Sequence, residues 1–251
     1  MISTPETPTK ILLLDIETAP SLGYVWAKWQ TNVIDFESDW YILSFAYKWT
    51  HEDQIHVKGL IDYPGYERHR ENDKALVKDL WKLLNEADII IAQNGDSFDI
   101  PKINTRFLIH NLQPPSPYKT IDTLKIAKKK FAFDSNKLDD LGHYLNIGRK
   151  LPHTGFHLWR SCISGDPEAW KTMKEYNAHD IVLLEKLYYK LRAWDTQHPQ
   201  VNKGLTVNEA CPKCSSPNTQ KRGFNYTLQR KKQRYQCMNC RGWFEGSAKK
   251  V

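Results

Sequence analysis

The sequence lacks any run of about 20 apolar residues, the length that a membrane-spanning helix needs. Residues 1–5 show no basic segment followed by an apolar one, so they do not resemble a secretory signal. Cysteine is scarce: there are five in 251 residues, and four of them lie in the last 43. These absences argue against a membrane protein and against a disulfide-rich secreted one, and they predict a cytoplasmic protein.

Positive charge is distributed unevenly within a net charge of +7. Residues 209–251 contain ten lysines and arginines against two acidic residues, whereas the preceding residues contain 26 basic and 27 acidic side chains. This asymmetry predicts a nearly neutral body and a tail that binds nucleic acid. We expect a folded domain at 1–197, a linker at 198–208 and a small basic domain at 209–251.

Hydrophobic patterning predicts that the body alternates strands and helices, with a loop and a short helical piece at 21–39. The first three strands suit an antiparallel meander, and a strand that follows a helix implies a parallel crossover. The sequence therefore predicts an α/β fold with a mixed sheet. The expected strands are 11–18, 40–49, 54–59, 88–92 and 118–123, and the expected helices are 72–86 (capped by Asn72), 101–110, 123–130, 138–146, 156–162 and 167–194.

Two carboxylates end the first apolar strand. Asp15 and Glu17 are two residues apart, so in a strand their side chains share a face. Burying two like charges side by side is costly, and a hard divalent cation would relieve that cost. The alternative is that Asp15 caps a turn and Glu17 is solvated.

Three further residues are able to complete a metal site. Asp99 follows a strand-to-helix turn, a place where active-site groups collect in α/β sheets. Tyr176 and Asp180 are four residues apart in a helix and share one face. Four carboxylates would neutralise two magnesium or manganese ions, as phosphodiester hydrolysis by paired metals requires. The alternatives are a helix cap for Asp99 and a solvated charge for Asp180.

In order and surroundings, these residues resemble the motifs of the DEDD exonucleases of the ribonuclease-H-like superfamily. Asp15-Ile16-Glu17 matches the first motif, the segment from Asn94 to Phe98-Asp99 the second, and Tyr176 with Asp180 the third. The tyrosine defines the branch, because the histidine branch would carry histidine where Glu175 stands. The resemblance covers residues 11–195 and is closest to stand-alone phage and bacterial members.

The resemblance implies stepwise removal of nucleotides from a 3′ end. It implies that Asp15, Glu17, Asp99 and Asp180 hold two metal ions while Tyr176 orients the attacking water, and it places Asn94 and Phe98 in the segment that meets nucleic acid. We expect single-stranded DNA as the substrate. Three alternatives stay open: the same chemistry on RNA, a structure-selective endonuclease, and a non-catalytic nucleic-acid-binding subunit.

The tail carries two C-x-x-C pairs, Cys211 with Cys214 and Cys237 with Cys240, separated by 22 residues. This pattern predicts one structural zinc ion held by all four sulfurs, and a pair of disulfides is the rival interpretation. A segment of this size has little core, so the metal would supply most of its folding energy. The fifth cysteine, Cys162, is expected to be a packing residue.

Basic and aromatic side chains alternate between the two cysteine pairs. Basic groups neutralise phosphates and aromatic faces stack on bases, a combination that suits single strands. The alternative is that the aromatic side chains fill the core of the tail. In the body, the lysine run 128–130 is interpreted as a solvated helix face. The tail residues expected to contact nucleic acid are Arg222, Arg230, Lys231, Lys232, Arg234 and Tyr235.

Overall fold

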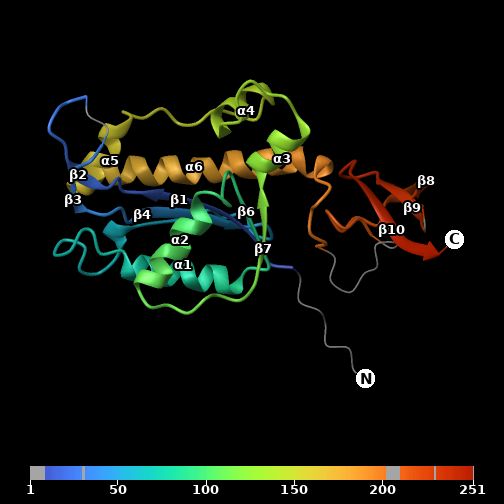
Figure 1. The fold of residues 1–251 in the computed structure, drawn as a ribbon, viewed down its shortest axis with the longest axis horizontal. Coiled ribbons are helices and arrows are strands. Elements are labelled where there is room, and N and C mark those ends of the chain that lie inside the picture. Colours follow the sequence, from blue (N-terminus) through green and yellow to red (C-terminus); the bar gives the residue numbers. More distant parts are fainter. Residues whose placement is uncertain (1–8, 30–31, 202–209, 229, 251) are drawn as a thin grey trace.

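A five-stranded mixed sheet forms the centre of the molecule (Figure 1). The structure, a computed structural model, describes residues 9–29, 32–201, 210–228 and 230–250. The strand order is β5-β4-β1-β6-β7. The central strand pairs antiparallel with β4 and parallel with β6, which confirms the predicted meander and crossover. The strands are β1 (Ile11–Thr18), β4 (Ile42–Trp49), β5 (His56–Gly59), β6 (Ile89–Ala92) and β7 (Lys119–Asp122).

Helices cover both faces of this sheet (Figure 1). Helices α1 and α2 lie on one face, and the long helix α6 crosses the other, with α3 and α4 beside it. The predicted helices are confirmed, with shifts of a few residues at their ends. They are α1 (Lys74–Glu86), α2 (Asp99–Ile109), α3 (Thr123–Lys130), α4 (Leu138–Tyr144), α5 (Phe156–Ile163) and α6 (Pro167–Leu191), with short 3-10 turns η1 (Leu60–Asp62) and η2 (Arg192–Trp194).

The side chains of β1 alternate between the two halves of the core. Leu12 and Leu14 belong to the hydrophobic cluster that includes residues of α1 and α2, whereas Leu13 belongs to the cluster that α6 completes. Successive side chains of a strand point to opposite faces, so Asp15 and Glu17 share the face of Leu13. Both carboxylates therefore lie on the side of the sheet that α6 covers.

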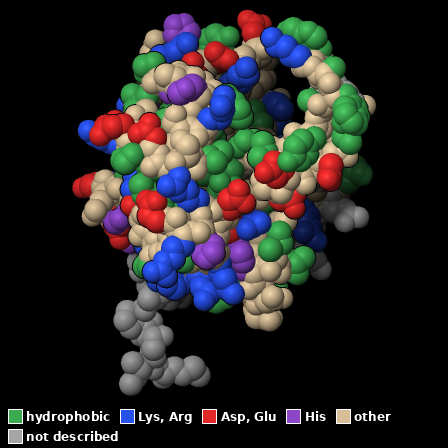
Figure 2. Space-filling model, turned by 90° about the vertical axis from the view of Figure 1, so that its left-hand side faces the viewer, with side chains coloured by type: hydrophobic (Ala, Val, Ile, Leu, Met, Phe, Trp, Pro, Cys, Tyr) green, Lys and Arg blue, Asp and Glu red, His purple; other side chains and the backbone are tan. Residues whose placement is uncertain are grey.

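The described residues of 21–39 include two paired strands and no helix, so the prediction of a loop with a helical piece was wrong. These strands, β2 (Leu22–Tyr24) and β3 (Asp35–Ser38), pair only with each other among the described residues. Trp26 and Trp29 between them are 85% and 86% exposed. Because the hairpin buries no face, its sequence shows no strand periodicity. Figure 2 faces this end of the molecule and shows hydrophobic side chains along an arched segment.

The start of α1 also differs from the prediction. The helix begins after Asp73 rather than Asn72, although Asn72 Oδ1 still accepts a hydrogen bond from Lys74 N at 3.1 Å. The Asp73 carboxylate is fully buried and accepts hydrogen bonds from Arg106 and from Ile42 N. This carboxylate therefore ties α2 to the sheet, because a buried charge needs such partners.

Cys162 is fully buried in the core, which confirms its packing role. No helix within the described ranges is both long and apolar enough to cross a membrane.

The C-terminal segment forms a separate three-stranded antiparallel sheet beside the end of α6 (Figure 1). Its strands are β8 (Thr219–Tyr226), β9 (Arg230–Cys237) and β10 (Trp243–Lys250). The buried Lys213 donates a hydrogen bond from Nζ to Ala193 O in η2 at 2.9 Å, and Val201 N donates one to Pro212 O at 2.8 Å. These contacts join the small sheet to the body, while most of the predicted linker 198–208 lies outside the described residues.

Candidate active site

Three carboxylates converge between β1 and α6. Ligand oxygens of Asp15, Glu17 and Asp180 all lie within 4.8 Å of one another. The first two come from one face of β1, and the third from the middle of α6, which packs across that face. The sequence spacing thus translates into one compact acidic cluster.

Asp99 lies beside this cluster, at the start of α2. Its buried carboxylate accepts a hydrogen bond from Ile16 N at 3.1 Å, between the two acidic residues of β1. Its negative charge raises the pKa of Asp15, after the larger effect of burial. Asp99 is therefore electrostatically part of the site, although its oxygens fall outside the group of three.

Lys150 joins Asp180 to Tyr176. Its Nζ donates hydrogen bonds to Asp180 Oδ2 at 2.6 Å and to Tyr176 Oη at 2.7 Å. The tyrosine is buried against the rings of His153 and Trp159, at centroid distances of 4.9 and 6.2 Å. The segment between α4 and α5 thus covers the part of α6 that carries Tyr176 and Asp180, the third motif.

Asn177 fixes the orientation of Asp15. Its Nδ2 donates to Asp15 Oδ2 at 2.6 Å, and its Oδ1 accepts from Ser44 Oγ at 3.1 Å. Since Asn177 and Ser44 are both fully buried, the amide is held by bonds at both ends. Such support of a ligand by a second layer of hydrogen bonds is typical of metal sites.

Burial and mutual repulsion make the carboxyl groups weak acids. Burial, opposed in part by Lys150, raises the pKa of Glu17 to about 8. Burial also raises the pKa of Asp99 to about 7, and it raises that of Asp15 well above its ordinary value. Clustered negative charge of this kind is stabilised by a bound cation.

The donor set fits a hard divalent cation. All the converging ligand atoms are carboxylate oxygens, which magnesium and manganese prefer. In addition, Asp180 Oδ1 is buried without a hydrogen-bond partner among the described residues. A buried carboxylate oxygen without a donor is costly, and a metal ion would supply the missing interaction. Asp15, Glu17 and Asp180 are the residues that would hold it, with Asp99 beside them.

Cavities open on two sides of the cluster. The larger, about 590 Å³, is lined by Asp15, Asn94 and Lys150. The other, about 440 Å³, is lined by Thr18, Trp40 and Trp159. Phe98 is part-exposed, with Lys102 Nζ 5.2 Å from its ring centroid.

Residues 34–192 match the RNase H superfamily model. The chain belongs to the RNase H superfamily. The matched region contains Asp99, Tyr176, Lys150 and Asp180, and the strand that carries Asp15 and Glu17 precedes it and completes the same sheet.

One solved structure is similar to this chain in fold. The family B DNA polymerase from the hyperthermophilic archaeon Pyrobaculum calidifontis is similar over 74% of this chain, with a TM-score of 0.51 and 16% identity. The chain corresponds to 25% of the length of that polymerase chain. At this identity the similarity is one of fold. The comparison with curated proteins found no match.

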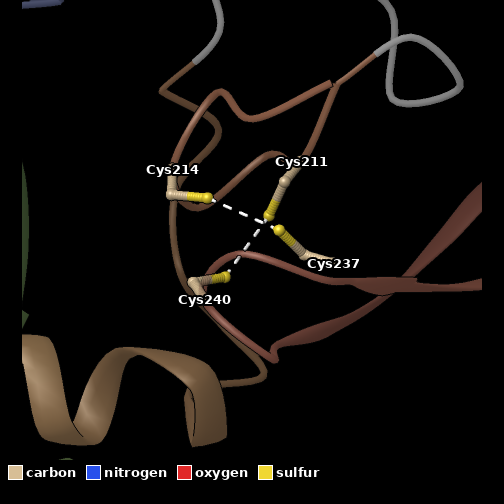
Figure 3. Close-up of side chains that lie close together, drawn as sticks. All are labelled: Cys211, Cys214, Cys237 and Cys240. Atoms are coloured by element: carbon tan, nitrogen blue, oxygen red, sulfur yellow. Dashed lines mark hydrogen bonds between the residues drawn. The ribbon is translucent and has the colours of Figure 1, made fainter. Parts of the chain in front are cut away.

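Outside the RNase H body, four cysteines form a second cluster (Figure 3). Their sulfurs point toward one another, within 4.8 Å, and none forms a disulfide. The Sγ atoms of Cys211 and Cys240 are 3.7 Å apart, and those of Cys214 and Cys237 are 3.6 Å apart. Zinc–sulfur bonds of about 2.3 Å in a tetrahedron place the sulfurs about 3.8 Å apart. The cluster therefore fits a tetrahedral zinc ion.

The predicted nucleic-acid contacts of the tail do not share one surface. Lys231 Nζ lies over the exposed ring of Phe224 at 4.0 Å, whereas Lys232 pairs with Glu245 at 2.9 Å. Neighbouring residues of β9 point to opposite faces, so these two lysines are separated. Tyr235 is buried and stacks on Phe244 at 5.3 Å, so this ring fills the core, as the alternative interpretation proposed for the aromatic residues. Arg222, Arg230 and Arg234 are exposed.

Sequence reasoning missed Lys150, Asn177 and Trp159. The asparagine was detectable, because it lies three residues before Asp180 in the same helix and thus faces the same side. The lysine lies in a segment without regular structure, where no periodicity relates it to α6.

Proposed function

We propose that the chain is a divalent-metal-dependent 3′–5′ exonuclease of the tyrosine DEDD branch, acting on DNA and preferentially on single strands. One observation carries the proposal: Asp15, Glu17 and Asp180 converge within 4.8 Å beside Tyr176. The RNase H fold and the similarity to a DNA polymerase support a nuclease. The motif resemblance supplies the 3′ polarity.

Two divalent cations, held by Asp15, Glu17, Asp99 and Asp180, would supply a nucleophilic water at neutral pH and neutralise the leaving oxygen. The protein contributes the orientation of these ligands. Asn177 restricts the Asp15 carboxylate, and the Ile16 amide restricts that of Asp99. Ligands held in place by packing and hydrogen bonds need no rearrangement when substrate arrives.

Tyr176 acts as a neutral hydroxyl. Burial raises its pKa to about 12, so it keeps its proton at neutral pH. Because its oxygen already accepts a hydrogen bond from Lys150, its proton is directed to another acceptor at the site. The hydroxyl thus positions the attacking water by hydrogen bonding, and it does not need to remove a proton.

Lys150 contributes a positive charge next to the carboxylates. The neighbouring Asp180 raises its pKa against the effect of burial, so the ammonium stays charged. A fixed cation beside the scissile phosphate stabilises the negative charge that develops during hydrolysis. The position of Lys150, between Asp180 and the larger cavity, suits that role.

The four-cysteine tail is proposed to be a zinc ribbon that assists substrate binding. Its exposed face carries Phe224 and Tyr226, with Lys231 Nζ 4.0 and 5.6 Å from their ring centroids. A cation above exposed aromatic rings suits contact with both the phosphates and the bases of a single strand.

The test is digestion of 5′-end-labelled oligonucleotides, single- and double-stranded, DNA and RNA, with magnesium or manganese. We expect single-stranded DNA to give a ladder that shortens one nucleotide at a time from the 3′ end. Faster digestion of RNA would select the ribonuclease alternative, and internal products without a ladder would select the endonuclease. Binding without metal-dependent cleavage of any substrate would leave a non-catalytic nucleic-acid-binding subunit as the remaining alternative.

A further inference from the structure

The lysine run 128–130 at the end of α3 has no part in the proposed chemistry. Helix α3 packs beside α6, toward the end of the body that is next to the C-terminal sheet (Figure 1). Lys128 and Lys129 are exposed, and no salt bridge to either occurs within the described part of the chain. Among the described residues, these two positive charges therefore have no acidic partner.

At one end, this run borders the larger cavity of the active site. Lys128, Lys137 and Lys150 line the same space of about 590 Å³ as Asp15. Asn136 also lines it, and its Oδ1 is buried without a hydrogen-bond partner among the described residues. A continuous space lined by three lysines thus leads from the acidic cluster to α3.

Of the two acidic side chains that line this cavity, Asp15 belongs to the acidic cluster and Asp139 already has partners. Asp139 lies 2.9 Å from Arg149 and accepts a hydrogen bond from Lys150 N at 2.8 Å. Lys150 pairs with Asp180, whereas Lys128 and Lys137 form no salt bridge among the described residues, so their charges remain available to an anion that enters from solvent.

At the other end, the run meets the junction between the body and the C-terminal sheet. Lys129 Nζ donates to Gln197 Oε1 at 3.1 Å, and the ring of Phe131 packs against that of Trp194 at 5.3 Å. A third cavity, about 390 Å³, opens at this junction. Its lining includes the basic Lys213 and Arg234, the acidic Asp195 and Glu245, and Trp243.

We propose that single-stranded DNA runs from the C-terminal sheet across α3 into the acidic cluster, and that Lys128 and Lys129 hold its phosphates. This proposal rests on the exonuclease function proposed above. The path is longer than one nucleotide, because Leu191 lies about 17 Å along α6 from Asp180. A strand must therefore have a minimum length before it gains the contacts on α3 and at the junction. The structure thus predicts a preference for long single strands over short ones.

The experiment compares the full chain with its Lys128→Gln/Lys129→Gln double variant. The matched control is Lys74→Gln/Lys78→Gln, which removes the same charge from exposed positions on α1, across the sheet from α3. Each protein is assayed for kcat/KM on single-stranded DNA of about 4 and about 24 nucleotides, lengths that bracket common single-strand footprints. Binding of the longer strand is measured against salt with calcium in place of magnesium.

We expect the full chain and the control to have a higher kcat/KM on the longer strand. In the α3 variant, the ratio of kcat/KM on the longer strand to that on the shorter one should fall by about tenfold. Loss of two phosphate contacts should also reduce the slope of log binding constant against log salt by about 1.4. An unchanged preference and slope in the α3 variant would overturn the path, and so would an equal loss on both lengths. Failure of the full chain to cut either strand would instead overturn the exonuclease function.

Discussion

Lys150 Nζ lies 2.6 Å from Asp180 Oδ2, so a positive charge is built into the acidic cluster by the protein itself. The lysine comes from the segment between α4 and α5, and the aspartate from the middle of α6. Their contact therefore fixes an irregular segment onto the helix that carries the third motif. It also places the ammonium group of Lys150 in the site beside Tyr176.

Replacing Lys150 with methionine should reduce kcat by about a hundredfold or more, the usual effect of losing a group that stabilises transition-state charge. Lys150→Arg should retain more activity, because it keeps the charge. The control is Lys48→Met, which breaks another part-buried pair with α6, Lys48–Glu185 at 2.7 Å, outside the cluster. Equal losses in the Lys48 and Lys150 methionine variants would show a structural effect rather than a role in the reaction.

Replacing Asn177 with leucine should weaken the affinity for the activating metal and lower activity by about 10- to 100-fold, as losing a hydrogen bond that orients a ligand does. The reason is that Asp15 Oδ2 loses the amide donor at 2.6 Å. Activity titrated against manganese checks this, and excess metal should restore part of the rate. If the variant had the wild-type metal dependence, Asn177 would not position Asp15.

Without magnesium or manganese, the protein should become less stable as pH rises. Glu17 and Asp99 have pKa values of about 8 and about 7 in the folded protein, above their ordinary values of 4.5 and 3.8. The folded state thus binds these protons more tightly than the unfolded state. The resulting stabilisation is complete below about pH 4 and is lost as pH rises toward 8.

Thermal unfolding between pH 5 and pH 8, with zinc retained, measures this effect. We expect Tm to fall by several degrees across that range, and manganese to reduce the fall. Glu17→Gln, which has no carboxyl to titrate, should show a smaller fall. A Tm that rose with pH in the metal-free protein would contradict the electrostatic description of the site.

Zinc should be present at one ion per chain and be lost on replacing Cys237 with serine. Because the small C-terminal sheet has few buried residues, loss of the metal should unfold it while the body stays folded. Metal analysis and limited proteolysis check both points, with Cys162→Ala as the control cysteine. A Cys237→Ser protein that kept full zinc would show that the four sulfurs are not the ligands.

Much of the body could be predicted because each of its motifs rests on local geometry. The i, i+2 spacing of Asp15 and Glu17 defines a strand face, and the i, i+4 spacing of Tyr176 and Asp180 defines a helix face. The packing of α6 over β1 then brings the two faces together. The strand face and the helix face both follow from regular periodicity, so both could be predicted from the sequence.

The remaining features depend on contacts between distant segments. Lys150 lies in an irregular segment, and the exposed hairpin around Trp26 and Trp29 buries no face, so neither has a periodic signal. The burial of Tyr235 follows from its pairing partners in the C-terminal sheet rather than from its own neighbours in sequence. Tertiary packing, and not local propensity, decides these positions.

In the proposed function, the cluster of Asp15, Glu17 and Asp180 hydrolyses phosphodiester bonds. The most direct measurement is release of nucleoside monophosphates from single-stranded DNA by the full chain and by Asp180→Asn, purified in parallel and matched for thermal unfolding. We expect manganese- or magnesium-dependent release by the full chain. The rate of release by the variant should be lower by about a hundredfold or more. Equal release by both proteins would contradict a role of this cluster in hydrolysis.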